Sequence, residues 1–208
     1  MTVRTDTPPA ATTPPATGSV WAKVLSEVFA PWVIVIALSG AVAWRATGEP
    51  LPTLGWGLLI AVTSSVLPMG VIVWGARRGR WDGHHVRDRT GRLVPFLTLI
   101  VLSALCLGLL LWWDAPRMVV ALDLAMLAAL LVSGLITAWW KVSMHAAVAA
   151  GAVVILAVAY TAWLLPLLGV AALVSWSRVR LGDHTVAQVT VGTVLGIVVG
   201  GGVFVLAL

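Results

Sequence analysis

Long apolar runs separated by short polar breaks dominate this sequence. The runs lie at about 28–46, 54–76, 94–113, 117–139, 145–163, 165–177 and 186–207. A helical run of about 20 residues matches the roughly 30 Å hydrocarbon core of a bilayer. The run at 165–177 spans only about 20 Å as a helix, so we expect it to dip in from one face or to end inside the membrane. The pattern predicts an all-α, polytopic integral membrane helical bundle of about six to seven transmembrane or partly inserted helices.

The composition supports a lipid environment. Of the 208 residues 60% are hydrophobic and 10% are charged, whereas soluble proteins average about 45–50% and about 25%. These values exclude a secreted disulfide scaffold, a disordered protein and a nucleic-acid-binding domain, so we expect no nucleic-acid partner. The single cysteine, Cys106, excludes an intramolecular disulfide and a cysteine-rich metal site.

The polar N-terminal stretch differs from the rest of the chain. Residues 1–19 are rich in Thr, Pro and Ala and contain no apolar run, so they bury too little surface to offset chain entropy. We expect a disordered tail at 1–19, followed by a single membrane-embedded domain at 20–208.

The cations are distributed unevenly between the two ends of the predicted bundle. If successive runs alternate in direction, eleven of the thirteen cations fall on the side of the tail and of the breaks at 77–92, 140–144 and 178–185. Only Arg45 and Arg117 fall on the opposite side. Because Lys and Arg are retained on the cytoplasmic side, we expect a multi-pass plasma-membrane protein whose 77–92, 140–144 and 178–185 breaks face the cytoplasm.

Two of the four histidines stand at the polar starts of apolar runs on this same side. Lys141 precedes His145 by four residues, and Arg178 precedes His184 by six. Histidine acts as a nucleophile or proton donor near neutral pH, so these residues are candidates for chemistry. Two polar residues at the membrane interface are the plainer alternative.

Three local strings match a family pattern. The segment Ser177-Arg178-Val-Arg-Leu-Gly-Asp183-His184-Thr-Val-Ala-Gln188 resembles the Ser-Arg-x5-His-x3-Asp motif of the type 2 phosphatidic-acid phosphatase superfamily. The segment Val142-Ser143-Met144-His145 resembles that family's Pro-Ser-Gly-His motif, about 40 residues upstream. Residues 87–95 resemble a degraded Lys-x6-Arg-Pro motif.

The resemblance implies a phosphatase that needs neither a metal nor another cofactor. It implies that His184 attacks phosphorus to form a phosphohistidine, while His145 protonates the leaving oxygen and later activates water. The implied phosphate ligands are Arg178, Ser143, Arg89, Arg92 and Lys141. Two alternatives stay open: Ser143 as an N-cap, and the loop arginines as topology signals and contacts to anionic lipid.

The largest departure from the family pattern is Gln188, which stands where the family has an Asp. Residues four apart on a helix can touch, so the Gln188 amide can accept the imidazole N–H of His184 as the third catalytic residue. An amide does not stabilise an imidazolium as a carboxylate does. The alternative is that Gln188 closes a capping box with Thr185. In the second motif, Met144 and Val142 replace Gly and Pro.

Two features lie inside the predicted helices. Asp123 is an acid well inside an apolar run, about two turns from Arg117, and we expect it to snorkel toward that interface. Gly192, Gly196 and Gly200 recur every four residues, which allows close helix packing. We expect them to pack against the chain's own helices; a homodimer through these glycines is the alternative.

The sequence therefore predicts an integral-membrane phosphatase of a lipid-linked phosphate or diphosphate. The expected substrate is a polyprenyl phosphate or diphosphate, phosphatidic acid or phosphatidylglycerol phosphate, taken from the bilayer. The competing hypothesis keeps the fold and the phosphate pocket but drops turnover, as in a lipid-phosphate-binding or scaffold protein. A small transporter would need paired intramembrane charges or repeated broken helices, and the sequence has no such repeat.

Overall fold

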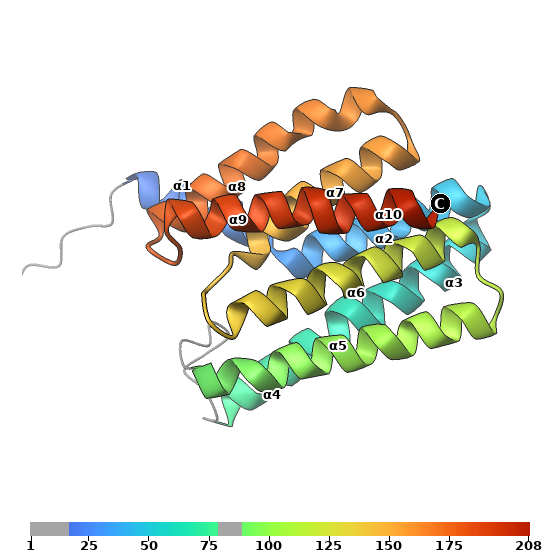
Figure 1. Cartoon of the computed structure of the whole chain (residues 1–208), viewed down its shortest axis with the longest axis horizontal. Helices are drawn as coiled ribbons and strands as arrows, with labels where there is room; N and C mark the ends of the chain where they lie inside the picture. The colour runs from blue at the N-terminus through green and yellow to red at the C-terminus, as the bar shows by residue number, and fades with distance from the viewer. Residues whose placement is uncertain (1–16, 79–88) are drawn as a thin grey trace, which may run out of the picture.

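The chain folds into apolar helices joined by short turns, as Figure 1 shows for this computed structural model. The structure describes residues 17–78 and 89–208, without the side chains of 17–19, 76 and 89–95. Its elements are α1 (Thr17–Val28), α2 (Pro31–Thr47), α3 (Pro50–Ala61), η1 (Val62–Val66), α4 (Leu67–Arg77), α5 (Arg89–Trp112), α6 (Arg117–Thr137), α7 (Met144–Ala159), η2 (Ala162–Leu167), α8 (Leu168–Arg180), α9 (Val186–Leu195), η3 (Gly196–Gly201) and α10 (Gly202–Ala207). No strand occurs among these described residues. The predicted all-α membrane bundle is confirmed.

Within the part of the chain that the structure describes, five helical segments are long and apolar enough to cross a bilayer. They are Val20–Thr47, Pro50–Gly75, Arg117–Thr137, Ala162–Arg180 and Val186–Ala207, beside two shorter apolar helices at Phe96–Trp112 and Met144–Ala159. The prediction for 165–177 was wrong, because η2 and α8 continue the helix to 19 residues. With the longer rise of the 3₁₀ turn, this segment reaches roughly 30 Å. The helix extends past the apolar run at both ends, to Ala162 and to Arg180.

The helices alternate in direction, so their connections gather at two ends of the bundle (Figure 1). One end carries α1 and the turns at 138–143 and 181–185. The other end carries the turns at 48–49, 113–116 and 160–161 and the C-terminus. At this second end, Nε of Arg45 donates to the Ala159 carbonyl at 2.9 Å and Nε of Arg117 to the Ala207 carbonyl at 2.9 Å.

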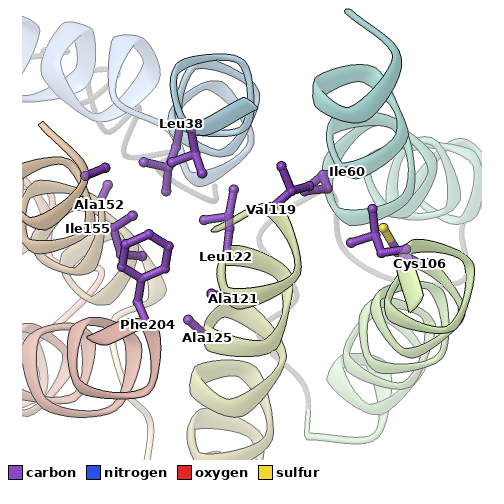
Figure 2. Packing of buried hydrophobic residues seen from close by; sticks show 13 residues of the cluster. Leu38, Ile60, Cys106, Val119, Ala121, Leu122, Ala125, Ala152, Ile155 and Phe204 are labelled. Atoms are coloured by element: carbon purple, nitrogen blue, oxygen red, sulfur yellow. The ribbon is translucent and has the colours of Figure 1, made fainter. Parts of the chain in front are cut away.

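The centre of the bundle is a closely packed apolar cluster that joins six helices (Figure 2). Fully buried members include Leu122 on α6, Ile60 on α3 and Phe204 on α10. Lipid tails are as apolar as these side chains, so the hydrophobic effect does not drive helices together in a bilayer. Close van der Waals contact in this cluster therefore holds the helices around the site described below.

Asp123 does not lie where the sequence suggested. It is fully buried in α6 instead of reaching the interface near Arg117. Its Oδ1 accepts from the hydroxyls of Ser64 in η1 at 3.5 Å and Ser103 in α5 at 3.4 Å. The expectation of snorkelling was wrong because two neighbouring helices supply hydroxyl donors inside the membrane.

The glycines of the last long helix face α7. A Cβ on Gly192 would lie 2.5 Å from the Ser143 carbonyl oxygen, and one on Gly196 would lie 2.0 Å from that of Ala147. Gly200 is also buried, close to Gly151 of α7. The expectation that these glycines pack within the chain fits this geometry. A contact between two copies through Gly192, Gly196 and Gly200 would require this face to open, so a dimer would need another face.

Candidate active site

The end of α8 turns back on itself and delivers His184 to the site. The N–H of Gly182 donates to the Val179 carbonyl at 3.0 Å, and that of Asp183 to the Arg178 carbonyl at 3.1 Å. These two bonds form the Schellman motif that ends many helices. Gly182 has φ 71°, which favours glycine at this position. The local sequence Arg-Leu-Gly-Asp-His therefore ends the helix and places the histidine just beyond it.

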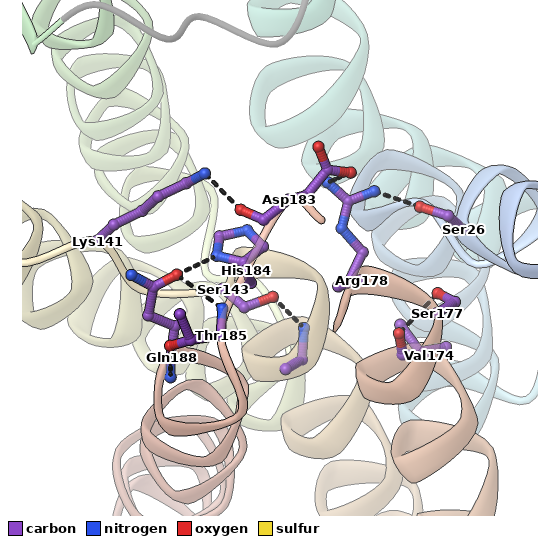
Figure 3. Close-up of polar contacts among 11 residues, drawn as sticks. Ser26, Lys141, Ser143, Val174, Ser177, Arg178, Asp183, His184, Thr185 and Gln188 are labelled. Carbon is purple, nitrogen blue, oxygen red and sulfur yellow. Dashed lines mark hydrogen bonds and ion pairs between the residues drawn. The ribbon is translucent and has the colours of Figure 1, made fainter. Parts of the chain in front are cut away.

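A single side-chain oxygen connects His184 to the start of α9 (Figure 3). Oε1 of Gln188 lies 3.2 Å from Nδ1 of His184 and accepts from the backbone N–H of Thr185 at 3.1 Å. The backbone N–H of Gln188 donates to Oγ1 of Thr185 at 3.3 Å, which completes a capping box. The two alternatives for Gln188 are therefore realised together.

The shared oxygen also determines the protonation of the ring. A backbone N–H is always a donor, so the Gln188 atom that it contacts is the amide oxygen, an acceptor. Nδ1 of His184 must then carry the proton to make its bond. The second ring nitrogen, Nε2, is left with its lone pair, as a nucleophile requires.

The environment of His184 keeps its imidazole neutral. The pKa of His184 is lowered from 6.5 to about 4. The largest cause is burial, and the positive charges of Lys141 and Arg178 act in the same direction. The hydrogen bond to Gln188 and the charge of Asp183 act in the opposite direction. The ring is therefore uncharged at neutral pH.

Arg178 is held rigidly near the end of α8. Its side chain is 5% exposed, and its Nη2 lies 3.0 Å from Oδ2 of Asp183. Its Nη1 donates to the hydroxyl of Ser26 on α1. Its Nε is buried and has no hydrogen-bond partner among the described residues. Asp183 and Ser26 fix the guanidinium, and Nε is a donor suited to an anion's oxygen.

Ser26 was missed by sequence reasoning. It lies on the amphipathic helix α1, about 150 residues from Arg178 in sequence, and no motif surrounds it. A contact between segments so far apart depends on how the helices pack, and α1 packs against α8. The sequence offers no signal for this contact beyond the amphipathic pattern of α1 itself.

Two contacts join the segment before α7 to the segment before α9 and to the first turn of α9. Nζ of Lys141 donates to the Asp183 carbonyl, and the Ser143 N–H donates to the Gln188 carbonyl at 3.3 Å. The Ser143 hydroxyl accepts from the Ala146 N–H at 3.4 Å, so Ser143 is the N-cap of α7. This arrangement brings two of the three predicted motifs together at one end of the bundle, although they are about 40 residues apart.

The remaining candidates lie at the edges of this cluster. His145 is half-buried in the first turn of α7. It lines a cavity of about 420 Å³ together with Arg178 and Ser26. Arg89 and Arg92 lie in the first turn of α5, but their side chains are outside the described part, as is the loop that contains His84 and His85.

Comparison with protein families finds a match over the part of the chain that carries most of this site. Residues 132–207 match the family model described as the PAP2 superfamily. This segment of the chain is therefore similar to the PAP2 superfamily. No curated protein and no solved structure matches the chain. The PAP2 match begins in α6 and runs to α10, so it contains His145, Arg178, His184 and Gln188 but neither Ser26 nor any of the helices before α6.

The PAP2 segment therefore brings together a neutral imidazole, a buried guanidinium and the N-terminal ends of α7 and α9. Helix N-termini carry partial positive charge and favour anions. Phosphoryl transfer depends mainly on positioning and on neutralising oxygen charge, and this set of groups suits it. Within the described ranges, His, Cys, Asp and Glu side chains form no group of three that could hold a metal ion.

Proposed function

We propose that this protein is a lipid phosphate phosphatase that works through a phosphohistidine. The superfamily match supports a hydrolase of phosphoric esters. The observation that carries the finer proposal is the hydrogen bond from Nδ1 of His184 to Gln188, which leaves Nε2 with the lone pair. A buried, neutral histidine with a defined tautomer is what nucleophilic attack on phosphorus requires.

In the proposed first step, Nε2 of His184 attacks the phosphorus and the bond to the ester oxygen breaks. His145 gives its proton to the leaving oxygen, so the lipid leaves as an alcohol or, from a diphosphate, as a monophosphate. In the second step, His145 takes a proton from water, the water oxygen attacks phosphorus, and the P–N bond breaks to release phosphate.

Negative charge on the phosphate oxygens is balanced by Arg178 and by the helix N-termini. Lys141, Arg89, Arg92 and the Ser143 hydroxyl are further phosphate ligands in this proposal, and the N-cap of Ser143 leaves its O–H proton available as a donor. Gln188 orients His184 but adds no charge. The imidazolium formed in the reaction is therefore stabilised less than in relatives with the family Asp.

The substrate's phosphate would reach this site at the membrane surface. The described end of the bundle that carries His145, Arg178 and His184 also carries Lys141 and Arg180. We propose that this end faces the cytoplasm of a plasma-membrane protein, in keeping with the preference of cations for that side.

Phosphate release by the protein purified in detergent, with EDTA present, tests the reaction. The panel contains phosphatidic acid, phosphatidylglycerol phosphate and prenyl phosphates and diphosphates. We expect release that survives EDTA and falls on the order of 1,000-fold or more in His184→Ala. Thr190→Ala on the same helix should retain activity, since its hydroxyl bonds only the Val186 carbonyl.

A labelled phosphate separates covalent catalysis from simple binding. A substrate labelled in the transferred phosphate should leave the label on wild type and on Thr190→Ala, but not on His184→Ala. Activity that EDTA abolishes, or label retained by His184→Ala, would contradict the phosphohistidine. If all variants bind the lipids without releasing phosphate, the protein is a binding or scaffold protein.

A further inference from the structure

The cavity beside the candidate site continues toward the middle of the membrane. Its lining includes Arg178 and His145 at the site and Ile155 farther along α7. Ile155 lies ten residues after His145, which is about 15 Å at 1.5 Å per residue. The cavity therefore extends through roughly half of the hydrocarbon core, and it is continuous with the residues proposed to bind phosphate.

The walls of this cavity are apolar in effect. Leu38, Ala125 and Ala152, which Figure 2 shows in the core cluster, belong to its lining. Three serines that line it use their protons within the protein, whereas the buried hydroxyl of Ser133, near the site end of α6, has no hydrogen-bond partner among the described residues. Ser64 and Ser103 donate to Asp123, and Ser65 donates to the Trp32 carbonyl at 2.9 Å. The inner part of the cavity therefore presents no free donor from these three hydroxyls and suits a hydrocarbon.

Two π-helical segments contribute to the same cavity. The η1 segment supplies Ser64 and Ser65, and the η3 segment supplies Gly196 and Gly200. A π-helical turn interrupts the regular helix and occurs frequently at functional sites. Both irregular segments of the long helices therefore contribute residues to the wall of the cavity.

We propose that this cavity binds a single apolar chain of the substrate, from the phosphate site down to the level of Ser64 and Ser103. The inference rests on the proposed function and names its substrate class: a phosphate or diphosphate of a single-chain alcohol, rather than of a diacylglycerol. The cavity volume of about 420 Å³ is spread over about 15 Å of depth along α7, so the cavity is long relative to its width and accommodates one extended chain.

Binding of alkyl phosphonates tests the cavity without turnover, because their C–P bond is not an ester. Single-chain phosphonates of increasing length, and a diacyl phosphonate, are titrated against the full chain in detergent. Ala129 on α6 lines the cavity, whereas its half-buried neighbour Ala128 does not. We expect Ala129→Leu to weaken binding of the longest single chain by roughly tenfold, because the larger side chain overpacks the occupied cavity, and to leave the shortest unchanged.

Ala128→Leu is the matched control and should alter neither affinity. Dividing each variant's affinity by that of wild type removes the partitioning of the longer chains into detergent. The proposal is overturned if Ala129→Leu affects short and long chains equally, if it affects neither, or if the diacyl phosphonate binds more tightly than every single-chain compound. A chain-length effect without hydrolysis of any ester would support the cavity while refuting the phosphatase.

Discussion

Gln188 accepts two hydrogen bonds on one oxygen, from the Thr185 N–H and from the ring of His184. A carboxylate at this position would hold the same proton and would also raise the pKa of the histidine by its charge. The amide fixes the tautomer without this electrostatic effect. The histidine consequently remains neutral over a wider range of pH than it would beside an acid.

Replacing Gln188 by Glu separates the charge from the geometry. Glu can accept both hydrogen bonds and is a preferred final residue of a capping box. Activity requires neutral His184, so kcat/KM of wild type should fall as pH falls through the pKa of about 4. In Gln188→Glu the acid limb should move upward by about one pH unit or more, because the carboxylate favours the protonated ring. The pH dependence of kcat/KM is the measurement.

The substrate's own titration affects wild type and Gln188→Glu equally, so it cancels in the ratio of their kcat/KM profiles. Gln188→Leu, which removes both hydrogen bonds, should lower kcat without a comparable upward shift of the acid limb of the kcat/KM profile. A ratio that does not vary with pH in Gln188→Glu would mean that this side chain does not control the ionisation of His184.

The residues of the candidate site were predictable from sequence to the extent that their geometry is local. His184, Gln188, Gly182 and Arg178 lie within eleven residues, and helix periodicity with one turn brings them together. Ser26 and the burial of Asp123 were not predictable in this way, because each depends on hydroxyls or cations from distant helices. The amide oxygen of Gln188 accepts from two donors, and this was not predictable either, since the sequence pattern presents the two roles as alternatives.

At the scale of secondary structure, α7 and the helix formed by α9, η3 and α10 hold the two histidines in place. Small residues let the two backbones approach closely, and the Ser143–Gln188 backbone bond joins their starts. The glycine spacing predicted this close approach. The length of the segment formed by η2 and α8 was not predicted, because Ala162 and Trp163 were included in the preceding apolar run at 145–163, whereas the helix of that run ends at Ala159.

Adding one methyl group to this contact tests its contribution. A Cβ on Gly196 would meet the Ala147 carbonyl oxygen at 2.0 Å, while one on Gly202 has nothing within 4 Å. We expect Gly196→Ala to reduce the free energy of unfolding by about 2–3 kcal/mol and to lower the unfolding midpoint in detergent by roughly 5–10 °C. Gly202→Ala should leave the midpoint nearly unchanged. Equal midpoints for the two variants would show that α7 and η3 are not packed as described.

At the scale of the whole molecule, the helices place the candidate site and the two isolated arginines at opposite ends. Arg45 and Arg117 each donate to a carbonyl near the end of a helix, which also compensates the negative end of the helix dipole. Their placement is accounted for by these contacts. The cations at the other end include groups proposed to hold phosphate, so the charge asymmetry reflects both topology and chemistry.

Cysteine accessibility determines which end faces the cytoplasm. In a Cys106→Ala background, a cysteine replaces either Gly83, between α4 and α5, or Glu49, at the opposite end. Reagent applied from outside intact cells should label Glu49→Cys, and Gly83→Cys should react only after the membrane is permeabilised. The reverse pattern would place the candidate site on the outer face.

The cavity is bounded by α1, α2, η1, α4, α5 and α6 on one side and by α7, α8 and η3 on the other. Because synthesis proceeds from the N-terminus, the first wall enters the bilayer before the second has left the ribosome. We expect bilayer lipid to contact the Leu38 and Ala125 side of the first wall during that interval, until the later helices close over it. Biogenesis would then load an apolar chain into the protein as it assembles.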